Sequence, residues 1–345
     1  MGNARTIAFL AVTTPLVEFL TGSTSAIGVL TNPITALVFV VLTLPGYILP
    51  VLLIREALVR WRKDGPALLT LGIAYGAVNE GLLAKTYFSV NPLSPVLGPS
   101  PGVGRWIGVN WPWVTEITFF HMIVSMSVPV VLAFLLFPET RQVRFLSERT
   151  IRWFLAYLLA VILGLLTIQS LFSLTFRDLL PLLLLPTSIV LLGVYLARRL
   201  PRSSPTSMHG HWLSRSVPLT LASMGFFIVT FFPIIQFFPF PFTPLTLVSQ
   251  QFYRLGELAG VIATIYPVIL VALAIRFFIR HSLTEKQLAA VTTGVMILPL
   301  ATAISVHDFP QGDLAAAAVY IAAIVVAWRR IKLRATTDRP SALPP

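Results

Sequence analysis

The chain has 345 residues, of which 56% are hydrophobic and only 11% are charged, and its mean hydropathy is +0.84. A soluble domain carries about 25% charged residues, so the composition excludes an ordinary soluble protein and indicates a polytopic, all-α membrane protein. The lack of cysteine excludes disulfides, thiol chemistry and cysteine-ligated metals.

Long apolar stretches predict ten transmembrane helices, because about 20 apolar residues span the hydrocarbon core. The predicted ranges are 6–21, 34–56, 67–88, 112–137, 152–175, 179–198, 216–238, 254–276, 287–306 and 313–331. Pro45, Gly46 and Pro50 predict a break in the second helix, and four prolines from Pro233 to Pro244 predict another in the seventh. Discontinuous helices are typical of transporters, although kinked packing helices would carry the same prolines.

The basic residues predict the orientation of this bundle. With ten helices, one set of alternating loops and ends contains 21 of the 25 lysines and arginines, and the other set contains four. Cytoplasmic loops are enriched in lysine and arginine, so we expect both termini in the cytoplasm. The net charge of +12 is therefore a topology signal with some contact to anionic lipid, and it does not indicate nucleic-acid binding.

The expected organisation is a single transmembrane domain over residues 1–335, with its polar residues concentrated in 15–140, followed by a disordered tail over 336–345. Its expected location is the cell membrane and its expected partner is the lipid bilayer.

Several polar side chains are predicted to lie in the outer half of the membrane. At 1.5 Å per residue, Glu80 is about 20 Å from the cytoplasmic start of its helix, and Glu18 is at a similar depth. His121 is about 14 Å below the outer boundary by the same rise. Asn79 precedes Glu80, and Glu116 is one turn below the outer boundary of the helix that carries His121.

A carboxyl group at this depth is costly, so it must be neutral, paired or in contact with water. Glu18 and Glu80 near His121 would form a group that exchanges protons at working pH. The alternative for each residue is a structural hydrogen bond between helices. Glu116 and His121 are five residues apart and do not share a helix face, so a metal site would need ligands from several helices.

Three further polar features have simpler interpretations. Lys85 is expected to reach the membrane surface as an anchor, and His209 and His211 are expected to lie in a solvated loop. Glu56 and Arg60 have the i, i+4 spacing of a helical ion pair.

Four different segments together carry a resemblance to a known family: "VEFLTGSTS" (17–25), "LLIRE" (52–56), "AYGAVNEGLLAKTYFSVNP" (74–92) and "GRWIGVNWPWVTEITFFH" (104–121). They resemble an uncharacterised family of prokaryotic multi-pass membrane proteins, which often has Glu-Glu-Gly where this chain has Asn79-Glu80-Gly81. The resemblance covers about residues 15–140 and implies a membrane protein without implying an activity.

A weaker resemblance is to the CPBP intramembrane proteases, and it would make Glu80 and His121 a catalytic pair. Asn79 replaces the first glutamate of that family's Glu-Glu motif, Ala84 stands where its arginine should be, and Ile117 replaces the phenylalanine four residues before the histidine.

We therefore expect a secondary transporter or proton-coupled carrier for an unidentified small molecule or ion, using Glu18, Glu80 and His121. A membrane-embedded hydrolase using Glu80 and His121, and a non-catalytic subunit or scaffold, are the alternatives. The sequence contains no nucleotide-binding loop and no HExxH helix, and it predicts no metal site and identifies no cofactor.

Overall fold

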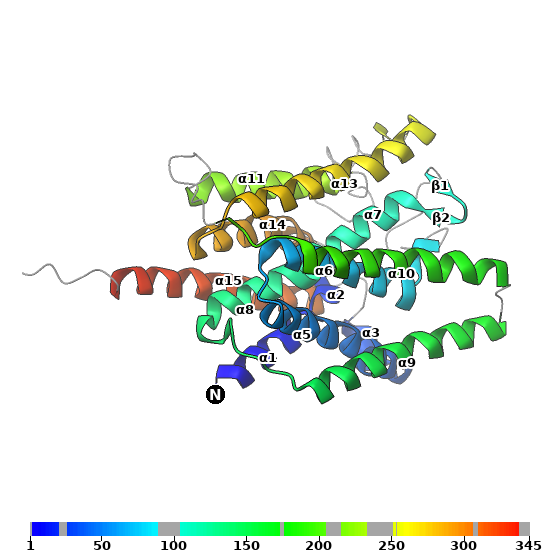
Figure 1. Cartoon of the computed structure of the whole chain (residues 1–345), viewed down its shortest axis with the longest axis horizontal. Coiled ribbons are helices and arrows are strands. Elements are labelled where there is room, and N and C mark those ends of the chain that lie inside the picture. The colour runs from blue at the N-terminus through cyan, green and yellow to red at the C-terminus, as the bar shows by residue number, and fades with distance from the viewer. Residues whose placement is uncertain are drawn as a thin grey trace, which may run out of the picture.

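The computed structural model describes residues 2–20, 26–88, 104–172, 176–204, 215–232, 251–252, 254–305 and 310–337. These residues form a bundle of helices that run roughly along one long axis (Figure 1). The strands within the described residues are β1 (Arg105–Trp106) and β2 (Val109–Asn110), which pair as a short antiparallel hairpin. The all-α prediction is confirmed.

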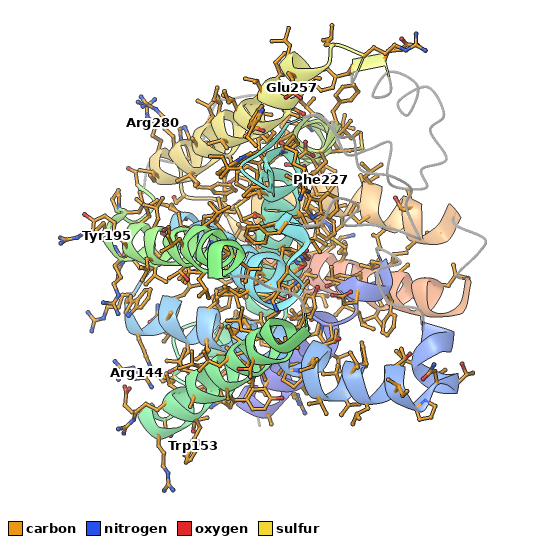
Figure 2. The ribbon with its side chains drawn as sticks, turned by 90° about the vertical axis from the view of Figure 1, so that its right-hand side faces the viewer. Arg144, Trp153, Tyr195, Phe227, Glu257 and Arg280 are labelled. Carbon is orange, nitrogen blue, oxygen red and sulfur yellow. The ribbon has the colours of Figure 1, made fainter. Side chains whose placement is uncertain are left out.

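Seven described helices are long and apolar enough to cross a membrane. They are Pro33–Arg60, Trp111–Leu136, Glu148–Thr167, Leu182–Arg199, Glu257–Arg280, Glu285–Ile304 and Leu314–Thr336. Each falls on one of the predicted helices. Trp111–Leu136 is mostly buried and Glu148–Thr167 is mostly exposed. Figure 2 shows the consequence: Trp153 lies at the edge of the bundle, whereas Phe227 lies inside it.

The first predicted helix, 6–21, is not continuous. The structure has α1 (Gly2–Thr13), a turn at residues 14–16 and the short α2 (Val17–Leu20). Pro15 lies in that turn, where its missing N–H prevents a regular helix from continuing. A further short helix, α3 (Ala26–Thr31), precedes the second predicted span.

The second span passes through its prolines without a break, contrary to the prediction. It consists of α4 (Pro33–Val38), the π-helical η1 (Phe39–Thr43) and α5 (Leu44–Arg60). Pro45 cannot donate to the carbonyl of Val41, four residues earlier. The Tyr157 hydroxyl donates to that carbonyl instead, at 2.6 Å, so a neighbouring helix satisfies the freed backbone group.

The third and fourth spans form the centre of the bundle. The third consists of α6 (Gly65–Gly76) and the π-helical η2 (Ala77–Leu83), followed by the short 3₁₀ helix η3 (Thr86–Phe88). The fourth consists of α7 (Trp111–Phe120), the π-helical η4 (His121–Ser127) and α8 (Val128–Leu136), followed by the 3₁₀ helix η5 (Pro138–Thr140).

The remaining spans surround this centre. They are α9 (Glu148–Phe172), α10 (Phe176–Arg199), α11 (Ser216–Thr230), α13 (Glu257–Arg280), α14 (Glu285–Ser305) and α15 (Pro310–Thr337). Three predictions lie outside the described residues: the proline run from Pro233 to Pro244, the loop with His209 and His211, and most of the predicted tail, although α15 includes its first two residues.

Segments that the predicted topology assigns to the cytoplasm contact one another at one end of the bundle. Thr6 bonds Thr140 at 3.1 Å, and Glu285 forms ion pairs with Arg141 and Arg334 at 2.6 and 2.8 Å. The N-terminus and the end of α15 both lie toward this end (Figure 1). We call it the inner end; its cytoplasmic orientation stays a prediction.

Candidate functional site

A direct hydrogen bond joins Glu80 to His121 in the middle of the bundle. Glu80 Oε1 and His121 Nε2 are 2.7 Å apart, and the two residues are only 8% and 4% exposed. Both come from π-helical segments, Glu80 from η2 and His121 from η4. Such irregular turns occur frequently at functional sites.

Neutral groups hold the two oxygens of Glu80 in place. Asn79 Nδ2 lies 3.2 Å from Glu80 Oε1 and 3.1 Å from His121 Nε2, so it touches both members of the pair. The Thr86 hydroxyl donates to Glu80 Oε2, and Trp113 Nε1 donates to the Thr86 oxygen at 2.9 Å. The indole N–H thereby directs the threonine proton toward the carboxyl group.

Ser125 contacts the other nitrogen of the histidine ring. His121 Nδ1 and Ser125 Oγ are 2.8 Å apart, one helical turn apart on the same segment. If Nδ1–H donates to Ser125, Nε2 of the neutral ring is an acceptor and Glu80 carries the shared proton. If His121 is protonated, both ring nitrogens donate and Glu80 is ionised. The pair can therefore hold its proton on either residue.

Glu18 is linked to the surroundings of this pair through Tyr47. The Tyr47 hydroxyl donates to Glu18 Oε1 at 2.5 Å. The Tyr47 ring lies 5.7 Å from the Tyr75 ring and 6.1 Å from the His121 ring, centre to centre, and the Tyr75 and His121 rings are 5.6 Å apart. Two buried tyrosines and His121 thus form one cluster of rings, and Tyr47 links that cluster to the Glu18 carboxyl group.

The Tyr75 hydroxyl differs from the Tyr47 hydroxyl in its hydrogen bonding. Tyr75 is 3% exposed, and its hydroxyl makes no hydrogen bond of normal geometry with the described residues, although it interacts with the neighbouring Tyr47. A buried hydroxyl with such incomplete hydrogen bonding carries a desolvation cost.

Close backbone packing sets the distance between Glu80 and His121. Gly72, Gly76 and Glu80 recur every fourth residue, so they share one face of their helix. A methyl group added at Gly72 would lie 2.8 Å from Met122 Cα, and one at Gly76 would lie 2.8 Å from Thr118 Cα. The small residues let the two helix backbones approach as a G-x-x-x-G motif does in membranes.

Glu116 does not join the pair. It is fully buried on α7, and the five-residue spacing turns it about 140° around the helix from His121, at about 100° per residue. Lys85 also departs from its prediction. It does not reach the surface but is 7% exposed, and its Nζ lies 3.4 Å from the Leu165 carbonyl oxygen.

Tyr47, Tyr75, Thr86, Trp113 and Ser125 are absent from the sequence-based candidates. Two of them carried a readable signal, because Tyr75 precedes Asn79 by four residues and Ser125 follows His121 by four, which places each pair on one helix face. The other three come from separate segments, and only the fold brings them to the site.

No group of three or more histidine, aspartate or glutamate side chains within the described residues has the arrangement of a metal site. The side chains gathered at the site are a carboxyl group, an imidazole and two phenols.

Comparison with known proteins gives one match. The chain belongs to a family described as an uncharacterized membrane protein family, which matches residues 14–343. No curated protein and no solved structure matches it. The family resemblance seen in residues 15–140 thus extends over nearly the whole chain, and the comparisons give the CPBP resemblance no support.

Proposed function

We propose that this protein is a proton-coupled carrier of the cell membrane, in which Glu80 and His121 bind and release the coupling proton. The observation that carries the proposal is the buried 2.7 Å contact between them. Glu80 is buried, and its hydrogen-bond donors Asn79 and Thr86 carry no charge. A buried acid–base pair of this kind suits a group that changes its charge during a working cycle.

Glu18 is the second proton-holding group of this proposal. Tyr47 is bonded to Glu18, and the Tyr75 ring is near both the Tyr47 ring and the His121 ring. A phenol both donates and accepts a hydrogen bond. The Tyr75 hydroxyl can therefore pass a proton between the two sides through one intervening water, by accepting a proton from one neighbour as it gives its own to the other.

The hydrolase alternative has no geometric observation in its favour. It needs a water molecule activated by Glu80, and the Glu80–His121 contact is direct. The scaffold alternative predicts that the polar groups make only fixed hydrogen bonds, so the experiment must detect a change of protonation.

The test is an infrared titration of the purified full-length protein in lipid, across about pH 5–8, where histidine-linked groups respond. We expect a carbonyl band from a protonated carboxyl group that changes with pH in the wild type and is lost in Glu80→Gln. Glu139→Gln is the matched control, because Glu139 is an exposed acid at the inner end and its loss should leave that band unchanged.

A second measurement separates a carrier from a static proton site. A pH jump applied to vesicles containing the wild-type protein should displace charge across the membrane, and Glu80→Gln vesicles should give no signal. Identical infrared and charge-displacement records for wild type and Glu80→Gln would exclude the proposal and leave the scaffold alternative.

A further inference from the structure

The inner half of the bundle contains an apolar cavity that none of the site residues lines. Its volume is about 390 Å³, and its walls come from α6, η4, α8, α11, α13 and α14. That volume lies within the range typical of small-molecule sites. An apolar cavity of this size stays dry, and leaving it empty forgoes packing that the surrounding side chains would otherwise make.

Two of the hydroxyl groups in the wall are bonded to backbone carbonyls. The Ser127 hydroxyl donates to the Met122 carbonyl at 2.7 Å, and the Ser223 hydroxyl donates to the Leu219 carbonyl at 2.7 Å. Both are bonds to the backbone of their own helix, so these two lining residues offer no free donor to a ligand. The chemistry that fits such a wall is an unbranched hydrocarbon chain.

The cavity opens on the surface of the bundle at a definite place. Leu273 lines it and is 56% exposed, so a lipid chain can enter beside α13. Other lining residues lie near the inner ends of their helices: Gly65 begins α6, Leu288 is in the first turn of α14, and Phe277 and Phe278 are in the last turn of α13.

Basic residues accompany these inner-end lining residues. Arg276 and Arg280 follow Leu273 by three and seven residues, so they lie on the side of α13 where the cavity opens, and both are exposed. Figure 2 shows Arg280 at the periphery of the bundle with its side chain directed outward. A positive rim above an apolar cavity is complementary to an anionic headgroup above an acyl chain, and the inner leaflet carries such lipids.

We propose that this cavity binds one acyl chain of an anionic phospholipid from the leaflet at the inner end, while Arg276 and Arg280 contact its phosphate. The inference does not depend on proton coupling, because the cavity and the Glu80–His121 pair share no lining residue.

The experiment uses the full-length protein in phosphatidylcholine vesicles that contain a trace of phosphatidylglycerol with a photoreactive diazirine at the end of one acyl chain. After irradiation, mass spectrometry of the digested protein locates the labelled residues. We expect labelling on α11, α13 and α14 at cavity-lining positions, and several-fold weaker labelling by phosphatidylcholine that carries the same photoreactive chain.

Two cavity-filling variants and one control sharpen the result. Ala274→Trp and Ala222→Trp fill the cavity from opposite walls and should reduce its labelling to background. Ala272→Trp should label as the wild type does, because Ala272 lies on the same helix, is exposed and does not line the cavity. Two filling positions guard against one variant failing to fold.

A double variant tests the proposed contact between the basic residues and the phospholipid headgroup. Arg276→Gln combined with Arg280→Gln should lower phosphatidylglycerol labelling to the phosphatidylcholine level. Three results would overturn the proposal: undiminished cavity labelling in both tryptophan variants, equal labelling by the two phospholipids in the wild type, or a photoreactive free fatty acid that labels the cavity as strongly as phosphatidylglycerol does.

Discussion

The inner end of the bundle and the Glu80–His121 site hold their carboxyl groups in different ways. At the inner end, Glu56 is 1% exposed and accepts from Arg60 at 2.8 Å, from the Phe145 backbone N–H at 2.9 Å and from Arg55 at 3.4 Å. The predicted pair between Glu56 and Arg60 is confirmed, and the structure adds Arg55, which is fully buried. Every one of these partners donates to a negative charge.

A second inner cluster follows the same rule. Glu285 pairs with Arg141 and Arg334, and Arg334 also donates to the Leu135 carbonyl at 2.8 Å. Leu135 belongs to the last turn of α8, where carbonyl groups lack helical partners and the helix dipole favours a positive charge. Ionised carboxylates and guanidinium groups fix this end of the bundle.

Glu80 has a different set of partners. Within the described part of the chain, no lysine or arginine forms an ion pair with it, and it bonds to an imidazole, an amide and a hydroxyl. A carboxylate balanced by guanidinium groups stays ionised, whereas one beside a histidine can gain or lose a proton. The comparison separates carboxyl groups bonded to guanidinium groups from a carboxyl group bonded to an imidazole, an amide and a hydroxyl, and four predictions test whether the two kinds behave differently.

The largest expected effect is on stability at the inner end. Glu56→Gln should destabilise the protein by about 3 kcal/mol, because it leaves the buried Arg55 without its counter-charge. The measurement is unfolding of the purified protein in mixed micelles. Glu148→Gln is the control, since Glu148 also pairs with Arg60 but has a side chain 71% exposed, and its loss should cost less than about 1 kcal/mol. Equal costs for the two variants would contradict the structural role assigned to burial.

The next effect concerns the backbone contact that positions the site. Gly76→Ala places a methyl group 2.8 Å from Thr118 Cα, so the helices must separate, at a cost of about 2 kcal/mol. Gly225→Ala on α11 is the control, because a methyl group there meets nothing within 4 Å, and helix propensity should raise stability by about 0.5 kcal/mol. The separation should also weaken the Glu80–His121 bond and alter the pH-dependent carboxyl band. A stable Gly76→Ala protein with an unchanged band would show that this packing does not set the site.

Glu80 itself should contribute little to stability. Gln keeps the shape and the hydrogen bonds of a neutral glutamic acid, so Glu80→Gln should change the free energy of unfolding by less than about 0.6 kcal/mol, and Glu80→Leu should cost about 1 kcal/mol. Both variants should abolish the charge displacement that follows a pH jump. If Glu80→Gln costs as much as Glu56→Gln, the Glu80 carboxylate is a fixed structural charge and the contrast between the two regions is lost.

Hydropathy predicted the membrane spans because the bilayer constrains helix length strongly, whereas the orientation inferred from loop charge stays a prediction. The apolar runs therefore located the spans, including the one from residue 33 to 60. The same reasoning failed at Pro45, because a hydroxyl on another helix, that of Tyr157, restores the lost hydrogen bond. Such compensation depends on tertiary packing, which hydropathy does not report.

The candidate site could be predicted only in part. The insertion cost of Glu80 and its depth relative to His121 singled out two residues that the fold brings into contact. The depth of a residue in the membrane did not predict toward which neighbouring helix its side chain is directed. Glu116 is therefore turned away, and Lys85 bonds a neighbouring helix rather than reaching the surface. The functional role of the candidate residues stays a prediction.

The smallest stability effect should come from the buried Tyr75 hydroxyl. Removing a hydrogen-bonded group leaves its partner unsatisfied, whereas removing a buried hydroxyl with incomplete hydrogen bonding relieves a desolvation cost. Tyr47→Phe should therefore lose about 1 kcal/mol, because Tyr47 donates to Glu18. Tyr75→Phe should leave stability unchanged or slightly higher, since its hydroxyl makes no hydrogen bond of normal geometry within the described residues.

If that hydroxyl passes protons between Glu18 and Glu80, Tyr75→Phe should nevertheless slow the charge displacement after a pH jump while keeping the infrared band of Glu80. Full-speed charge displacement in Tyr75→Phe would remove the tyrosine from the proton route and leave Glu80 and His121 to exchange protons without Glu18.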